Sequence, residues 1–355
     1  MCWNTSRCAG WVQVWAAVVV VANTVSGLWA GVRDGRLDIY WIDVEGGAAT
    51  LMVTPAGQTI LVDTGNPGPR DPDRIVRTLV EQAGCQKIDF LVITHYHRDH
   101  YGGAATLATQ VPIDTLYDNG RFDGMPDDPG REYFEFPCRK RIVIQPGMRL
   151  PVMQREGSPP LEILCLAARQ QFIDPPAGVP ENTAICQSHR DKERDGSDNA
   201  NSIVLLVRFG MFRFLDAGDL TWNLEKRLVC PVNLVGEVDV YQVTHHGLDS
   251  SNNPVVLQSI KPTVAVMNNG ATKGCMPEVF ATLKETPSLE AIYQVHRNVR
   301  PDGSVNNTAD EYIANDEVAC KGEGIVLSVA ADATSYEVRV PAKGHRRTFA
   351  VRAKP

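Results

Sequence analysis

The sequence lacks several features that would each point to a particular class of protein. None of its nine cysteines stands in a CxxC or CxxxC arrangement, so a structural zinc knuckle is not expected. Its longest apolar run is shorter than the ~20 residues needed to span a bilayer. No unit of about 20 to 50 residues is repeated, which argues against solenoid and propeller folds.

Positive charge is also scarce. Lys and Arg number 35 against 42 Asp and Glu, which gives a formal net charge of -7. Non-specific binding to DNA depends on Lys and Arg that neutralise phosphates, so a general polyanion binder is disfavoured, although a local basic groove stays compatible with this charge. The 355 residues, 43% hydrophobic and 22% charged, are typical of a globular protein.

The N-terminus has the pattern of a secretory signal peptide. Arg7 precedes the apolar stretch "GWVQVWAAVVVVA", and small residues follow up to Ala30. About a dozen apolar residues fit the core of a signal peptide. We therefore expect residues 1–30 to be a signal peptide and the mature chain to be secreted or periplasmic, without a stable membrane anchor. An uncleaved anchor is the alternative.

Cysteine usage fits an oxidising compartment but predicts no pairing. Seven cysteines would remain after cleavage of the signal peptide. This odd number leaves at least one free thiol or an intermolecular disulfide.

From residue 37 on, the patterns predict a layered α/β architecture in one domain, residues 31–355, with a core of about 37–330. The runs "LDIYWIDV", "ATLMVT" and "QTILVDTG" predict an antiparallel meander, followed by a helix over 71–84 and a strand over 88–94. Residues 118–200 lose this rhythm and are predicted to be surface insertions around a pocket, with only brief strand candidates such as "RIVI" and "LEILCLA". The basic tail "KGHRRTFAVRAKP" is predicted to be a frayed terminus.

Histidine is concentrated in the segment "ITHYHRDHYGG", residues 93–103. Alternate side chains of an extended chain point the same way, so His95 and His97 can bind one ion. The chain then turns and redirects Asp99 and His100 to a second position. The spacing therefore predicts a site for one or two divalent ions, with zinc expected first and Mn2+ or Fe2+ left open.

Further donors are predicted at the ends of other strands. Asp219 in "FLDAGD" is a carboxylate that could bridge two cations. "VTHHG" supplies His245 as a ligand, with His246 as the rival for that role and otherwise as a proton donor. Asp63 in "ILVDTG" is predicted to accept a hydrogen bond from a ligand histidine or a loop amide. The predicted catalytic residues are Asp99, Asp219 and His246.

In this order, these elements resemble the metallo-β-lactamase fold superfamily of metal-dependent hydrolases. The residues that carry the resemblance are Asp63, the "HYHRDH" segment, Asp219 in "DAGD" and the His245-His246 pair in "HHG". It covers about residues 37–330. It implies a four-layer αββα sandwich with the metal ions at one edge, between the sheets.

The sequence departs from the superfamily pattern at one place. Zinc β-lactamases, glyoxalases and lactonases carry another histidine in a Gly-His context between HxHxDH and the bridging aspartate. Here the only histidine in that interval is His189, within "CQSHRDKE". "DNANSIVLLV" together with "HHG" resembles instead the ComEC-like branch of nuclease-type domains associated with DNA uptake. The first metal could then be held by two histidines, Asp219 and solvent, with Asn201 or Ser202 nearby.

The resemblance implies a secreted hydrolase that uses a metal-activated water, because a bound cation lowers the pKa of its water to roughly 7. A phosphodiester or other phosphoester, in a small molecule or a polymer, is the expected substrate, and Lys273 is a candidate contact to an anionic group. The alternatives are hydrolysis of a lactone, amide or β-lactam, and a metal-binding module without catalysis. The acidic composition makes free DNA a doubtful substrate.

Overall fold

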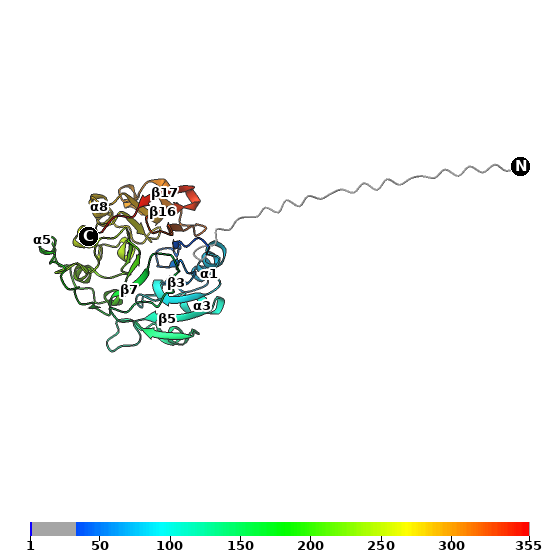
Figure 1. Cartoon of the computed structure of the whole chain (residues 1–355), viewed down its shortest axis with the longest axis horizontal. Helices are drawn as coiled ribbons and strands as arrows, with labels where there is room; N and C mark the ends of the chain where they lie inside the picture. Colours follow the sequence, from blue (N-terminus) through cyan, green and yellow to red (C-terminus); the bar gives the residue numbers. More distant parts are fainter. Residues whose placement is uncertain (2–32, 355) are drawn as a thin grey trace.

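The chain is described by a computed structural model that covers residues 1 and 33–354 (Figure 1). Apart from its first residue, the predicted signal peptide lies outside the described residues. Two mixed β-sheets form the centre of the molecule, with helices on their outer faces.

The first sheet contains nine strands in the order β17-β16-β15-β1-β2-β3-β4-β5-β6. The predicted meander is confirmed, since β1 to β3 pair antiparallel, and β3 to β6 then run parallel. The strands are β1 (Leu37–Trp41), β2 (Thr50–Val53), β3 (Thr59–Val62), β4 (Ile88–Val92), β5 (Ile113–Asp118), β6 (Lys140–Val143), β15 (Ile325–Val329), β16 (Ser335–Val340) and β17 (His345–Ala350).

The second sheet contains eight strands in the order β14-β13-β12-β11-β10-β9-β7-β8. Its strands are β7 (Leu161–Ala168), β8 (Gln171–Phe172), β9 (Val204–Phe209), β10 (Phe212–Asp216), β11 (Val240–Gln242), β12 (Val264–Met267), β13 (Ala291–His296) and β14 (Ile313–Asn315). Strands β10 to β14 run parallel, so the loops that follow them gather at one edge of the sheet.

Helices cover the outer faces of the two sheets, and in Figure 1 α1 and α3 lie on the side of the molecule opposite α8. The α-helices are α1 (Arg70–Arg77), α2 (Arg98–Tyr101), α3 (Ala104–Gln110), α4 (Gly130–Glu135), α5 (Thr183–Cys186), α6 (Trp222–Glu225), α7 (Pro254–Ile260) and α8 (Pro277–Glu285). A π turn extends α1 over Thr78–Gln82, and the 3₁₀ segments are Asp198–Asn201, Lys226–Leu228, Thr244–Gly247, Pro301–Ser304, Asp310–Tyr312 and Pro341–Lys343.

The side-chain alternation of the strands separates three hydrophobic layers. Ile39 and Trp41 of β1 point between the sheets, where Trp41 packs edge-on against Phe214 with ring centroids 5.7 Å apart. Tyr40 points the other way, toward the layer that contains Leu107 of α3. Helices α7 and α8 cover the second sheet in the same manner. These layers confirm the predicted αββα sandwich.

Two parts of the chain are more ordered than the sequence suggested. β7 lies at the brief strand candidate "LEILCLA" within the predicted insertions over 118–200, and it is an inner strand that pairs with β9 in the second sheet. The prediction of a frayed C-terminal tail is wrong, because β17 pairs with β16 along its whole length and Phe349 stacks on Tyr336 at 5.3 Å. β17 is an edge strand whose other face, formed by Arg346, Thr348 and Ala350, is exposed, so it has no apolar run.

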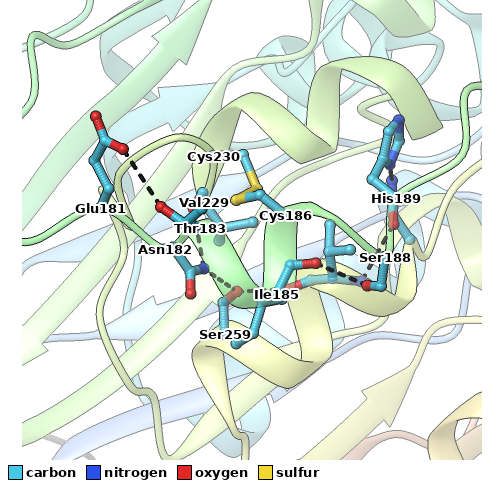
Figure 2. The surroundings of a disulfide bond; sticks show 12 residues. Glu181, Asn182, Thr183, Ile185, Cys186, Ser188, His189, Val229, Cys230 and Ser259 are labelled. Carbon is cyan, nitrogen blue, oxygen red and sulfur yellow. Dashed lines mark hydrogen bonds between the residues drawn. A yellow bond between two sulfur atoms is a disulfide. The ribbon is translucent and has the colours of Figure 1, made fainter.

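A disulfide between Cys186 and Cys230 ties the insertion that contains α5 to the chain after α6 (Figure 2). Asn182 adds hydrogen bonds from its side-chain amide to Ser259 Oγ at 2.7 Å and to the Val229 carbonyl at 3.1 Å. The other five cysteines among the described residues are free thiols.

Candidate metal centre

The predicted metal ligands meet where parallel strands of both sheets end. His95, His97, Asp99 and His100 follow β4, Asp219 follows β10, and His245 and His246 follow β11. Ligands far apart in sequence converge because the carboxyl ends of parallel strands lie at the same edge of a sheet. Asp219 is buried at their centre.

Four donor atoms form a compact set around the Asp219 carboxylate. The Nε2 atoms of His100 and His246 lie 3.2 Å apart, and they lie 3.1 and 3.3 Å from Asp219 Oδ2. Each also lies 3.4 Å from Asp99 Oδ2. Ligands about 2.0–2.1 Å from one tetrahedral ion are separated by about 3.3 Å. These spacings therefore match a tetrahedral divalent cation.

Hydrogen bonds at the far ring nitrogens select the tautomers of these imidazoles. Nδ1–H of His100 donates to Asp63 Oδ2 at 2.7 Å, and Nδ1–H of His246 donates to the Asn268 carbonyl at 3.3 Å. With Nδ1 protonated, a neutral imidazole presents a lone pair at Nε2. Two such lone pairs and two carboxylates then face one another, an arrangement that a cation at this place would stabilise.

The electrostatics agree with this requirement. Burial alone would raise the pKa of Asp219, but the imidazoles of His100, His246 and His245 hold it well below its usual range. Burial alone would lower the pKa of His100, but the carboxylates of Asp219, Asp99 and Asp63 raise it well above its usual range. The site thus stabilises positive charge, and a divalent cation would supply that charge. The residues fit the metal that the sequence predicted.

His95 and His97 lie beside this set of four donors. His95 is fully buried, and its Nε2 lies 3.9 Å from Asp219 Oδ2 with no hydrogen-bond partner among the described residues. The His97 ring packs 4.8 Å from that of His95, but its Nε2 faces Asp127 Oδ2 at 3.4 Å. The structure therefore brings His95 to Asp219 and leaves His97 at the rim.

The two consecutive histidines take different places. His246, not His245, contributes to the four-donor set. Both have left-handed backbone conformations, with φ of 56° and 55°. Such conformations cost about 1–3 kcal/mol in non-glycine residues and are concentrated at functional sites. The next loop packs closely against this turn: a Cβ on Gly274 would lie 1.9 Å from the His246 carbonyl oxygen.

Several residues that support the site were not predicted as such. Thr94 donates its hydroxyl hydrogen to Asp63 and accepts from His95 Nδ1 at 3.1 Å. Lys273 forms an ion pair with Asp99.

Asp63 has its predicted role, because it accepts hydrogen bonds from both the predicted ligand His100 and the Thr94 backbone amide, the latter at 2.8 Å. Ser202, expected near the first metal, accepts from the Asp219 amide at 3.1 Å.

The comparisons with known proteins agree with this arrangement. Residues 42–156, which include Asp63 and the HxHxDH segment, match the model of the Metallo-beta-lactamase superfamily. This chain has the metallo-β-lactamase fold. The match confirms the relationship that the sequence motifs predicted.

Among curated proteins, Recombination protein 2 of Haemophilus influenzae is 25% identical over 231 residues, 64% of this chain and 24% of that protein. Competence protein ComA of Neisseria gonorrhoeae is 27% identical over 256 residues, 72% of this chain and 30% of that protein. A UPF0173 metal-dependent hydrolase of Cupriavidus metallidurans is 34% identical over 84 residues, 22% of this chain and 26% of that protein. The chain thus spans a third or less of the length of these relatives. They support the prediction that this metallo-β-lactamase-fold chain is an enzyme.

Proposed function

We propose that this chain is a metal-dependent hydrolase of phosphodiester or other phosphoester bonds. The observation that carries the proposal is that the Nε2 atoms of two histidines and the carboxylate oxygens of Asp99 and Asp219 lie together at one place. His100, His246, Asp99 and Asp219 would hold a divalent cation, with zinc expected first. Such a cation supplies Lewis acidity and lowers the pKa of water to roughly 7.

The protein side chains would orient the reactants. Asp99, whose Oδ2 also forms an ion pair with Lys273, is placed to orient an attacking water as well as to bind metal. The hydrogen bond of His246 Nδ1 to the Asn268 carbonyl orients its Nε2 toward the metal position, so His246 is proposed as a metal ligand in place of a proton donor. The side chain of Lys273 is 38% exposed and is placed to attract an anionic substrate.

The choice of a phosphoester rests on two further points. Two of the relatives named above are a recombination protein and a competence protein, names that suggest nucleic-acid chemistry. The chain also lacks the Gly-His histidine that zinc β-lactamases and lactonases carry. A small phosphoester, a nucleotide or an envelope polymer is the proposed substrate.

Activity and metal content together test this proposal. Purified protein should contain at least one divalent ion per chain by elemental analysis and should hydrolyse bis(p-nitrophenyl) phosphate. Asp219→Asn should abolish both properties, whereas Asp89→Asn, a change at a buried aspartate in β4, should retain them. Turnover of a lactone or a cephalosporin alone would contradict the proposal in favour of a carbonyl hydrolase. Substoichiometric metal without turnover would indicate a metal-binding module.

We also propose that the mature protein acts outside the cytoplasm. The Cys186–Cys230 disulfide supports this, because such bonds persist in oxidising compartments. Among the described residues, no helix is both long and apolar enough to cross a membrane. Expression in a bacterial host with N-terminal sequencing of the periplasmic and secreted fractions tests the proposal. A mature N-terminus near Gly31 is expected, and full-length protein confined to the cytoplasm would contradict it.

A further inference from the structure

A cleft of about 570 Å³ lies beside the metal centre, between the insertion that contains α5 and the loops that follow β10 and β11. Sites for small ligands typically have volumes of about 300–1,000 Å³, so this cleft is large enough for part of a substrate. Ser250 lines it, and its Oγ lies 3.1 Å from His245 Nδ1. The other ring nitrogen of His245 lies 3.5 Å from Asp219 Oδ2. The cleft is therefore within reach of a substrate bound at Asp219.

The outer wall of the cleft is fixed to α6 by hydrogen bonds. Asn223 uses both ends of its side chain, because Nδ2 donates to the Lys192 carbonyl at 2.8 Å and Oδ1 accepts from the Lys192 amide at 3.0 Å. Trp222 Nε1 donates to the Arg190 carbonyl at 2.8 Å. A ligand would enter a cleft whose wall is already held in place, so it would lose less free energy to ordering the protein.

The charges that line the cleft disfavour a second phosphate. Three carboxylates stand against two cations: Glu193, Asp195 and Asp249 against Lys192 and Arg194. Lys192 is already engaged, because its ammonium donates to the Asp249 carbonyl and lies 3.8 Å from the centre of the Trp222 ring. A polyphosphate or a continuing nucleic-acid chain would meet net negative charge here. The lining is better suited to an uncharged group.

The hydrogen-bonding groups left over in the cleft suit hydroxyls. The side chains of Glu193, Arg194 and Asp249 form no hydrogen bond or ion pair within the part of the chain that the structure describes. An ionised carboxylate only accepts hydrogen bonds and a guanidinium only donates them, whereas a hydroxyl does both. The half-buried ring of Trp222 adds apolar surface against which the C–H groups of a sugar ring can pack.

We propose that this cleft binds a hydroxyl-bearing sugar ring that is joined to the scissile phosphate. The inference rests on the proposed function and deepens it, because it names the group that the phosphoester carries. Lys273, at Asp99, attracts the charge of the phosphate, and the cleft beside His245 holds the uncharged ring. Nucleosides and glycan units offer the same hydroxyl chemistry, and the test separates these two sources.

Binding of sugars that contain no phosphate tests the inference without reference to turnover. Adenosine or methyl N-acetyl-β-glucosaminide should change the tryptophan fluorescence of the full chain, and Trp222→Phe should lack this change. Trp41, the other tryptophan in the described part of the chain, is buried between the sheets and should not respond. A response to adenosine would assign the ring to a nucleoside, and a response to the glycoside would assign it to a glycan.

Failure of the inference and failure of the proposed function give different results. No response to either sugar would overturn the inference, and hydrolysis of bis(p-nitrophenyl) phosphate by the same sample would leave the proposed function intact. A response in protein that hydrolyses no phosphoester would support the sugar site and contradict the hydrolase. Adenine is the matched ligand without a sugar. If adenine bound as tightly as adenosine, stacking of the base on Trp222 would replace the sugar as the explanation.

A variant that keeps the shape of the cleft tests the role of its carboxylates. Glu193→Gln combined with Asp249→Asn should weaken sugar binding about tenfold, because hydrogen bonds to ionised acceptors are stronger than those to neutral amides. Both side chains are exposed, so the variant should fold, which circular dichroism verifies. Glu181→Gln, at an exposed site in the same insertion but outside the cleft, is the matched control and should bind sugar unchanged. Unchanged affinity in the double variant would overturn the inference.

Discussion

The Asp63 carboxylate accepts the Nδ1 hydrogen of His100 at 2.7 Å, and both side chains are buried. This contact fixes the ring orientation and the tautomer of an imidazole whose other nitrogen faces Asp219. Thr94 shares the same carboxylate, so Asp63 also sets the hydroxyl direction that determines the tautomer of His95. One aspartate that is not a predicted ligand thus prepares two imidazoles for metal binding.

Asp63→Asn should therefore weaken metal binding while keeping the predicted ligands. Outer hydrogen-bond partners of ligand histidines typically contribute about 10–100-fold in metal affinity, and a loss of that size is expected. Competition with a chromophoric chelator measures it. Asp89→Asn is the control, because Asp89 is buried in the same sheet but accepts from Thr59. Zn2+ affinity equal to that of the unmodified protein would contradict this role of Asp63.

Much of this centre was predictable from the sequence, because its ligands stand in short motifs at the ends of strands. The HxHxDH spacing and the place of Asp219 after a β run indicate a metal site by themselves. It was not predictable which of His245 and His246 joins the four-donor set, because this depends on left-handed backbone conformations that residue types alone do not indicate. The contacts of His245 Nδ1 with the hydroxyls of Ser250 and Ser251, both at 3.1 Å, likewise involve residues that no motif marks.

The parts of the fold that escaped prediction share a physical cause. β17 lies at the sheet edge and buries little besides Phe349, so its sequence "HRRTFA" shows no apolar periodicity. The partners Cys186 and Cys230 are 44 residues apart, and they meet only because the insertion folds back on the second sheet. Such contacts depend on long-range packing, which local patterns do not encode.

Lys273 is expected to favour anionic substrates. Its loop is held rigidly, since Arg300 donates to the carbonyls of Gly274 at 2.6 Å and Thr272 at 3.2 Å, so the ammonium stays at Asp99 on the rim of the site. Lys273→Gln should lower kcat/KM for bis(p-nitrophenyl) phosphate about tenfold, which corresponds to about 1.4 kcal/mol, and should spare a neutral nitrophenyl ester. Lys273→Arg should retain most of the activity.

The control is Lys284→Gln, which replaces an exposed lysine of α8. It should leave kcat/KM unchanged for both the anionic and the neutral substrate. Equal losses on the anionic and the neutral substrate would show that Lys273 acts by positioning Asp99 instead of by attracting charge. Metal content measured in the same samples separates these cases, because misplacement of Asp99 should also lower the metal affinity.

The Cys186–Cys230 disulfide should contribute substantially to stability. It closes a loop over a separation of 44 residues, for which the chain-entropy model gives about 4 kcal/mol. The Cys186→Ser/Cys230→Ser double variant should unfold at clearly lower urea concentration, and dithiothreitol should have the same effect on the unmodified protein. Cys85→Ser, at a free thiol, is the control. Unchanged urea midpoints would show that the hydrogen bonds of Asn182 hold the insertion without the disulfide.

Glu225 should make the stability of the protein depend on pH near neutrality. Burial raises the pKa of its carboxyl to about 7, and one of its oxygens has no partner among the described residues while the other accepts from the Asn253 amide at 2.8 Å. Since the pKa is higher in the folded state, the contribution of Glu225 to stability is full below about pH 4.5 and is lost as the pH rises toward 7.

Glu225→Gln cannot titrate, so its free energy of unfolding relative to the unmodified protein should rise by up to about 1.4 kcal/mol per pH unit between pH 5 and 7 and then level off. Urea unfolding at pH 5, 6, 7 and 8 measures this difference, and the exposed Glu181→Gln should show none. A difference between Glu225→Gln and the unmodified protein that is constant over this range would mean that Glu225 is ionised in the folded protein, stabilised by the backbone amide of Asn253.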